Sequence, residues 1–206
     1  NLLCVFGGAR SGKSTIMSIL GGRELFETSD QLDSFTMGIN VGNHFMQLQD
    51  FCGWYGGRSP LDPESRQPLV TQDGNYPLVG FVDAEGQGDQ TSHDYDIKLI
   101  AGPMLLSKVI IFNVGAAQGV LVNETLAKLE LLTKVAKRYC QADVLQKGVA
   151  PFGFLHIVKR DCKPGAMRQG VEYYKRQLLD DEEGSQFNAT RKSLRDSFRG
   201  IDCHLL

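Results

Sequence analysis

Near the start of the chain, Gly7-Gly8-Ala9-Arg10-Ser11-Gly12-Lys13-Ser14 matches the pattern Gly-x-x-x-x-Gly-Lys-Ser. An apolar run over residues 2–6 precedes this segment, and a helical pattern follows it, from about Lys13 to Gly21-Gly22. Glycine lets the backbone curl tightly, so that successive N–H groups can point at the oxygens of one phosphate group. A glycine turn that only caps a helix is the alternative. The full spacing, with a strand before and a helix after, favours a phosphate-binding loop.

Each part of this loop has an expected role in holding a nucleotide. The loop N–H groups and the positive end of the following helix should contact phosphate oxygens. Lys13 should bridge the β- and γ-phosphates, and the Ser14 hydroxyl should be a ligand of Mg²⁺. The expected nucleotide-binding residues of this segment are Gly7, Gly8, Ala9, Arg10, Ser11, Gly12, Lys13, Ser14 and Thr15.

Strand-like and helix-like patterns alternate along the rest of the chain. Strands are expected at residues 2–6, 41–48, 76–82, 109–114, 152–158 and 201–206, and helices at 13–20, 120–139, 169–179 and 187–198. Residues 27–40 are expected to form a loop, and residues 52–74 a surface insertion between two antiparallel strands, with a turn at Asp73-Gly74. This order predicts an α/β fold, a mostly parallel sheet flanked by helices on both faces, as in a Ras-like P-loop NTPase domain.

Length and composition indicate one ordinary globular domain. The chain has 206 residues, of which 42% are hydrophobic and 22% charged, and a formal net charge of −2. This charge gives no general attraction to nucleic acid or to anionic lipid. No apolar run reaches the length of a membrane span, and we expect no signal peptide, because the sequence opens on a strand-like run. Since strand-like runs lie at both ends, we expect residues 1–206 to be a single domain cut from a longer chain that carries further helical parts.

The cysteines and histidines form no motif along the sequence. The five cysteines stand singly (Cys4, Cys52, Cys140, Cys162 and Cys203), and the four histidines lie far apart (His44, His93, His156 and His204). Their spacing suggests neither a zinc site nor a redox pair. We therefore expect thiols in a reducing compartment, histidines that are structural or incidental, and a location in the cytoplasm or on the cytosolic face of an intracellular membrane.

A candidate metal-binding carboxylate follows the strand expected at residues 76–82. The segment is Asp83-Ala84-Glu85-Gly86-Gln87-Gly88-Asp89. An aspartate at this strand tip could hold Mg²⁺ through water, and a backbone N–H near Gly86 could reach the γ-phosphate. Asp-x-x-Gly is also a common turn, so the prediction depends on the motif following a phosphate-binding loop.

Two further segments complete the expected site. Thr36, within Ser34-Phe35-Thr36-Met37-Gly38, lies where a switch loop needs a hydroxyl for the metal, although it could be an ordinary loop threonine. Arg160-Asp161 follows the fifth strand, where GTPases place the carboxylate that reads the base. A carboxylate can accept hydrogen bonds from N1–H and N2–H₂ of guanine, and adenine offers no such pair. The more common Asn-Lys-x-Asp signature is absent, and a solvated Arg-Asp surface pair is the alternative reading.

Together these segments resemble the guanylate-binding protein and atlastin branch of the dynamin-like large GTPases. The resemblance rests on residues 8–14, Thr36-Met37-Gly38-Ile39, residues 83–89 and Val158-Lys159-Arg160-Asp161, and residues 198–206 resemble the last strand of an atlastin-type G domain. It implies that Arg10 is an internal arginine finger, and such fingers increase the rate by about 10³–10⁵-fold. It also implies that Ser34 and Glu85 position the attacking water. The insertion at residues 52–74 is longer than expected for either relative.

The sequence therefore predicts a Mg²⁺-dependent GTP hydrolase that binds GTP and GDP and forms a homodimer through its nucleotide face. The expected catalytic residues are Arg10, Lys13, Ser34, Thr36 and Glu85, and the expected metal ligands are Ser14, Thr36 and, through water, Asp83. Nucleic acid is not an expected partner, and membrane association would need regions outside these residues. Two alternatives remain: another P-loop phosphotransferase, and a nucleotide-binding scaffold that dimerises with little turnover.

Overall fold

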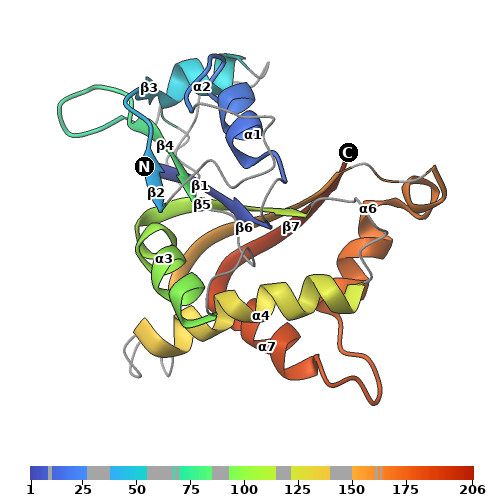
Figure 1. Ribbon diagram of the computed structural model, residues 1–206. Helices are drawn as coiled ribbons and strands as arrows, with labels where there is room; N and C mark the ends of the chain where they lie inside the picture. The colour runs from blue at the N-terminus through green and yellow to red at the C-terminus, as the bar shows by residue number, and fades with distance from the viewer. Residues whose placement is uncertain are drawn as a thin grey trace.

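The computed structural model describes residues 1–8, 11–26, 38–54, 67, 70–84, 93–114, 122–139, 150–160, 162 and 164–206. Within these ranges the elements follow the order β1 (Leu2–Gly7), α1 (Lys13–Leu20), β2 (Ile39–Val41), β3 (Met46–Gln47), α2 (Leu48–Trp54), β4 (Leu78–Ala84), α3 (His93–Leu106), β5 (Ser107–Val114), α4 (Val122–Tyr139), β6 (Phe152–Lys159), α6 (Pro164–Leu179), α7 (Asn188–Ser197) and β7 (Phe198–Leu205) (Figure 1).

The strands form one mostly parallel sheet, as the sequence predicts. Its order is β2-β4-β1-β5-β6-β7, and β3 pairs with β4 off this path. The strands β4, β1, β5, β6 and β7 run parallel to their neighbours, whereas β2 and β3 are antiparallel to β4. The central strands β1 and β5 are almost fully buried, which is why they are continuous apolar runs in the sequence.

Helices cover both faces of the sheet and create two hydrophobic cores. Leu3 and Val5 of β1 pack with Met17 of α1 on one face, and the partly buried Phe51 of α2 packs against this core. Cys4 and Phe6 of β1 point to the other face, into a larger core that is completed by α3, α4, α6 and α7. Figure 1 shows α1 and α2 on one side of the sheet and α3, α4 and α7 on the other. The predicted fold class is therefore confirmed.

The region before β4 differs from the predicted single strand at residues 41–48. Two short strands, β2 and β3, pair with β4 there, and α2 begins at Leu48. Ile39 and Asn40, expected in a loop, belong to β2. The Gly42 N–H donates to the Phe81 carbonyl oxygen at 2.8 Å just after β2, and the Leu48 N–H donates to the Pro77 carbonyl oxygen at 2.8 Å where α2 begins. These contacts to the segment around β4 divide the region into β2, β3 and α2, and the local sequence pattern does not reveal them.

The expected insertion is partly visible. Residues 52–54 belong to α2, while residues 71–75 form the predicted turn, in which the Thr71 N–H donates to the Asn75 carbonyl oxygen at 2.7 Å. Gly74 supplies the positive φ of 78° that this turn uses. The strands on either side are antiparallel as predicted, with Met46 opposite Val79.

One long helix, α3, was not anticipated from the sequence. It contains Gly102 and Pro103, two residues that weaken a helical pattern. Its buried residues Ile97, Ile100 and Met104 nevertheless follow helical spacing and face the larger core. Among the helices that the structure describes, none has the length and apolar character that crossing a bilayer requires.

Candidate functional site

The phosphate-loop segment lies between β1 and α1, as its sequence predicts. Gly12 immediately precedes α1 in a left-handed conformation, with φ 72° and ψ 33°. A side chain at Gly7 could not fit, because its Cβ would lie 2.2 Å from the carbonyl oxygen of Asn113 in β5. Both glycines of the motif are therefore required for steric reasons, one by its backbone conformation and one by the close approach of β5.

The charged and hydroxyl side chains of the motif meet a carboxylate from β4. Lys13 is 7% exposed, and its Nζ donates to the Gly8 carbonyl oxygen at 3.1 Å. The Ser14 hydroxyl donates to a carboxylate oxygen of Asp83, which is fully buried near the end of β4. Mg²⁺ prefers oxygen ligands and retains several waters, so a hydroxyl and a carboxylate that face each other fit this ion. The structure thus brings together two of the three predicted metal ligands.

Asn113 in β5 supports the loop and was missed by the sequence analysis. Its side chain is 1% exposed, and its Nδ2 donates to the Ser11 carbonyl oxygen. A buried amide in the otherwise apolar run 109–114 was the available signal, because buried polar groups need a partner. Asn113 fixes the backbone of the phosphate loop from the neighbouring strand.

Arg160 connects the predicted base-reading segment to the phosphate loop. Its N–H donates to the Val114 carbonyl oxygen at 3.2 Å, which anchors the end of β6 to β5. Its guanidinium lies against Gly12, where a Cβ would be 2.9 Å from Nη1. Arg160 is therefore partly buried against the loop, while Asp161 lies outside the described residues.

Several buried polar atoms around the loop have no hydrogen-bond partner among the described residues. They are Ser11 Oγ, Asn113 Oδ1 and Arg160 Nε. Each buried polar atom of this kind costs about 1–3 kcal/mol unless something else satisfies it. A polar ligand at the phosphate loop could supply such partners.

The remaining predicted residues divide into two groups. Gly8 adjoins β1, and Thr15 is exposed in the first turn of α1. The other predicted site residues lie outside the described residues and stay predictions: Ala9, Arg10, Ser34, Thr36, Glu85, Gly86 and Asp161.

Two of the histidines, far apart in the sequence, come together in the structure. The parallel pairing of β6 and β7 brings His156 and His204 together, with His156 Nδ1 2.9 Å from His204 Nε2. His44 lies elsewhere, with Nδ1 3.2 Å from Nη1 of Arg23. By contrast, Cys4 and Cys203 are buried, and burial raises the pKa of both thiols, that of Cys203 to about 12. These two thiols are therefore protonated and unreactive at neutral pH.

The sheet is mostly parallel, a phosphate loop follows its central strand, and a carboxylate lies near the end of the neighbouring strand in the sheet. This arrangement is the fold of a P-loop GTPase domain. No protein family model and no curated protein sequence matches the chain. Among solved structures, Toc33 from Arabidopsis thaliana with GDP and Mg²⁺ is similar, with TM-score 0.53 and 12% identity over 99% of this chain and 69% of that chain.

Two further structures show the same likeness. Toc33 from Arabidopsis thaliana with Mg²⁺ and GMPPNP has TM-score 0.51 and 13% identity, over 99% of this chain and 70% of that one. A structure of the chloroplast translocon components atToc33 and psToc159, for which dimerization is described as important for GTPase activity, has TM-score 0.54 and 11% identity, over 99% and 69%. At these identities the likeness establishes the fold.

Proposed function

We propose that this chain binds GTP together with Mg²⁺ and hydrolyses it to GDP and phosphate. The observation that carries the proposal is the contact between the Ser14 hydroxyl and the Asp83 carboxylate, next to the buried Lys13. A hydroxyl, a carboxylate and a lysine around a glycine-rich loop are the groups that a magnesium–nucleotide complex needs. Ser14 and, through water, Asp83 would hold the ion, which when bound neutralises charge on the phosphate oxygens.

Lys13 would contact the phosphates directly. Its Nζ now donates to the carbonyl oxygen of Gly8, within the loop that would surround the phosphates. When a nucleotide enters, we expect the ammonium group to exchange this neutral acceptor for β- and γ-phosphate oxygens. A charged acceptor makes the stronger hydrogen bond, particularly where burial has removed water.

Guanine selectivity would come from Asp161, and the support for this is the position of its neighbour. The guanidinium of Arg160 lies against Gly12, so the segment at the end of β6, with Arg160, adjoins the phosphate loop. A nucleotide with its phosphates in the loop would place its base near this segment. The Asp161 carboxylate would then accept the N1–H and N2–H₂ hydrogens of guanine, for which adenine has no equivalent.

The finer assignment to the guanylate-binding protein and atlastin branch of dynamin-like GTPases is part of the proposal. In this reading Thr36 and Gly86 contact the metal and the γ-phosphate, Ser34 and Glu85 position the attacking water, and Arg10 stabilises charge in the transition state. Two chains would meet through their nucleotide faces in the cytoplasm. The description of dimerization as important for GTPase activity in atToc33 and psToc159 is consistent with such an arrangement.

The first test is calorimetric titration with GDP, ADP and a non-hydrolysable GTP analogue, each with Mg²⁺. The wild-type chain should bind both guanine nucleotides and not ADP, and Asp161→Asn should lose this selectivity. Asp196→Asn is a matched control, because Asp196 is an exposed carboxylate of α7, a helix on the opposite face of the sheet from α1. Equal binding of ADP and GDP by the wild-type chain would contradict the proposal.

A second test separates the enzyme from a scaffold with little turnover. GTP turnover per molecule is measured at low and high protein concentration. A dimer-activated hydrolase should show a rate per molecule that rises with concentration, and Arg10→Ala should remove the rise. A negligible rate at every concentration would favour the scaffold.

A further inference from the structure

We propose that His156, Asp202 and His204 form a binding site for a transition-metal ion of the Zn²⁺ class, separate from the Mg²⁺ site at the phosphate loop. The proposal is independent of the nucleotide, and it starts from the register of two neighbouring strands. In the β6–β7 pairing, His156 lies opposite Asp202, and Val158 lies opposite His204. Alternate residues of a strand share a face, so the three side chains project from the same side of the sheet.

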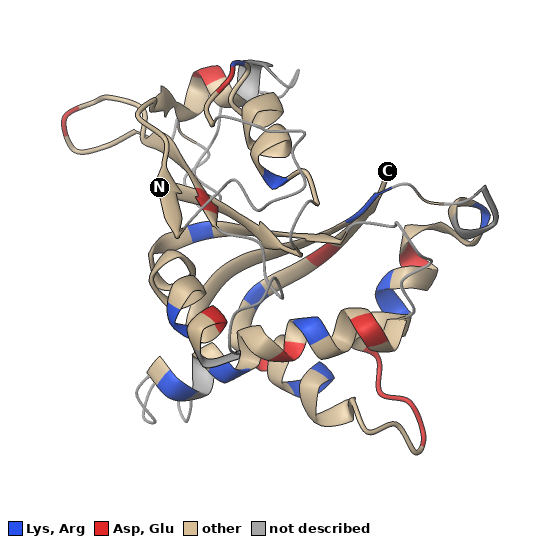
Figure 2. Cartoon of the chain, viewed as in Figure 1, with Lys and Arg blue, Asp and Glu red and all other residues tan. Residues whose placement is uncertain are grey.

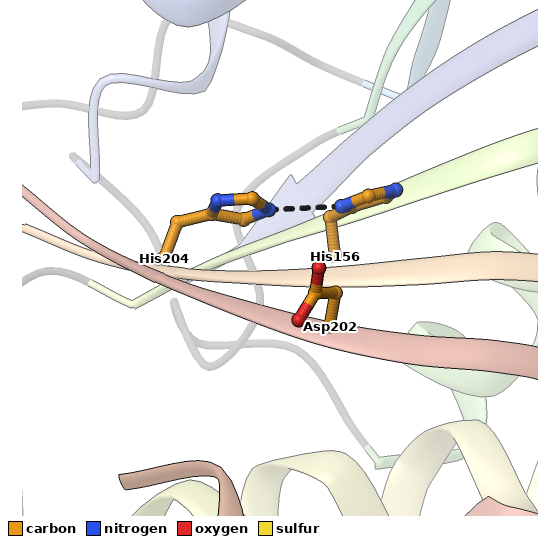
Figure 3. Close-up of side chains that lie close together, drawn as sticks. All are labelled: His156, Asp202 and His204. Atoms are coloured by element: carbon orange, nitrogen blue, oxygen red, sulfur yellow. Dashed lines mark hydrogen bonds between the residues drawn. The ribbon is translucent and has the colours of Figure 1, made fainter. Parts of the chain in front are cut away.

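The face is the one that carries α1. Val158 and Ile111, the latter paired with His156, belong to the core beneath α1. Figure 3 shows His156 on β6, with His204 and Asp202 on the adjacent β7. His156 is partly buried, whereas Asp202 and His204 are exposed, so an ion from solution can reach all three.

The distances fit a shared ion. His156 Nδ1 and His204 Nε2 form a hydrogen bond of 2.9 Å, whose proton a metal ion would displace, and one donor atom from each of the three residues lies within 4.8 Å of the others. Two nitrogens bound to one tetrahedral zinc at about 2.0–2.1 Å are about 3.3 Å apart, close to the distance observed. The imidazole rings are nearly parallel, at 23° with centroids 5.2 Å apart. A small movement of Asp202 would complete a three-ligand set, with further positions left for water.

The ligand types select the kind of metal. Two imidazole nitrogens and one carboxylate suit Zn²⁺, Co²⁺, Ni²⁺ or Cu²⁺, while Mg²⁺ prefers oxygen ligands only. His156, Asp202 and His204 are also the group of three or more histidine, cysteine or carboxylate side chains that, among the described residues, lie close enough together to hold an ion. Mg²⁺ should therefore not bind at the histidines, and excess Mg²⁺ should keep a zinc-class ion from the oxygen ligands at Ser14.

The neighbours of Asp202 both orient the carboxylate and compete for it. The N–H of Cys203 donates to Asp202 Oδ1 at 3.0 Å, which fixes the group as outer contacts do in metal sites. The ammonium of Lys175 in α6 also donates to Oδ1, at 3.0 Å. A bound cation would share Asp202 with Lys175 or displace it. Removal of the lysine charge should therefore strengthen metal binding, and this effect is specific to a metal site.

The test is calorimetric titration of the whole chain with Zn²⁺ in excess Mg²⁺, which occupies oxygen-only sites. We expect one ion per chain, about 100-fold weaker binding in His204→Gln, and no change in His44→Gln, the same substitution beside Arg23. Lys175→Gln should tighten binding about three- to fivefold, the size of an exposed ion-pair effect. The absorption bands of Co²⁺ should report nitrogen ligands in the wild-type chain and change in His204→Gln.

Several results would overturn the proposal. They are the absence of Zn²⁺ binding to the wild-type chain, equal binding by His204→Gln, and weaker binding by Lys175→Gln. Thermal unfolding of each variant checks that it is folded. If His204→Gln does not fold, Asp202→Asn replaces it, and retained wild-type affinity in that variant would equally contradict the site.

Discussion

The phosphate-loop end of the sheet and the connection between α6 and α7 differ in how far their buried polar groups are paired within the chain. Around the loop, Ser11 Oγ, Asn113 Oδ1 and Arg160 Nε have no hydrogen-bond partner among the described residues. At the connection, Arg191 of α7 is 1% exposed, and both of its terminal nitrogens are saturated, although its Nε has no hydrogen-bond partner among the described residues. Their acceptors are Ser185 Oγ and Asn188 Oδ1, both at 2.9 Å, and the Gln177 carbonyl oxygen and Glu182 Oε2, both at 3.2 Å.

We interpret this difference as one between the region that we propose binds a nucleotide and a region that stabilises the fold. Figure 2 shows the acidic residues that follow α6 as a red run, close to basic positions of α7. Arg191 and Arg195 hold this run in place from inside the protein and from its surface respectively. Substitution of the α7 arginines that hold the connection should therefore change folding and leave binding intact, and substitution of Lys13 at the loop should do the reverse.

Arg191→Ala should have the largest effect. It leaves several buried acceptors without their donor and should lower the free energy of unfolding by about 3 kcal/mol, or about 6–12 °C in Tm. Chemical denaturation measures the loss, and calorimetry with GDP and Mg²⁺ should show unchanged affinity for the folded fraction. A large loss of affinity in folded Arg191→Ala would remove the distinction between the two regions.

Lys13→Met should give the converse result. The substitution retains the apolar stem and removes the ammonium, so GDP affinity should fall about 100-fold, equivalent to about 2.7 kcal/mol. Thermal unfolding without nucleotide should be nearly unchanged or slightly raised, since a charge leaves a buried position. Unaltered GDP affinity would exclude a phosphate contact for Lys13.

Asn113→Ala tests the link between the two properties. The loop loses its support at the Ser11 carbonyl oxygen, so both stability and binding should fall, by about 1–1.5 kcal/mol and about tenfold. Asn123→Ala, at an exposed position in the first turn of α4, is the matched control and should change neither. If Asn113→Ala lowered stability alone, the residue would be part of the core and not of the loop.

Arg195→Ala should have the smallest effect. Arg195 is 38% exposed, and its ion pair with Asp181 spans 3.1 Å on the surface. Exposed pairs of this kind contribute about 0.2–1 kcal/mol, so denaturation should show a loss below 1 kcal/mol. A loss of unfolding free energy as large as that of Arg191→Ala would mean that burial does not decide how much each arginine stabilises the protein.

The sequence predicted what depends on local pattern. The strand–loop–helix unit at residues 2–20, the buried run of β5 and the long helix α4 all have a periodicity that short-range sterics and burial impose. Gly102 and Pro103 weaken that signal in α3, and contacts to the segment around β4 divide the region of β2, β3 and α2. These two regions were therefore not predicted.

In the candidate site too, the residues with a local motif were predicted, and those that depend on long-range contacts were not. The chemistry of Lys13, Ser14 and Asp83 was evident from motif order, although Ser14 and Asp83 are 69 residues apart. Asn113 has no motif of its own, and its role depends on how β5 lies beside β1. The meeting of His156 with His204, which are 48 residues apart, depends on the register of β6 and β7, which no local spacing encodes.

The position of β1 in the sheet has a consequence for how the protein is made. Its parallel partners are β4 and β5, with Leu2 opposite Gly80 and Ser107. At a synthesis rate of about 5–20 residues per second, β1 waits on the order of 5–20 s before both partners exist. During that time the apolar residues Leu3 to Phe6 lack at least one of their two partner strands. The nascent chain should consequently be a substrate for holding chaperones until β5 has left the ribosome.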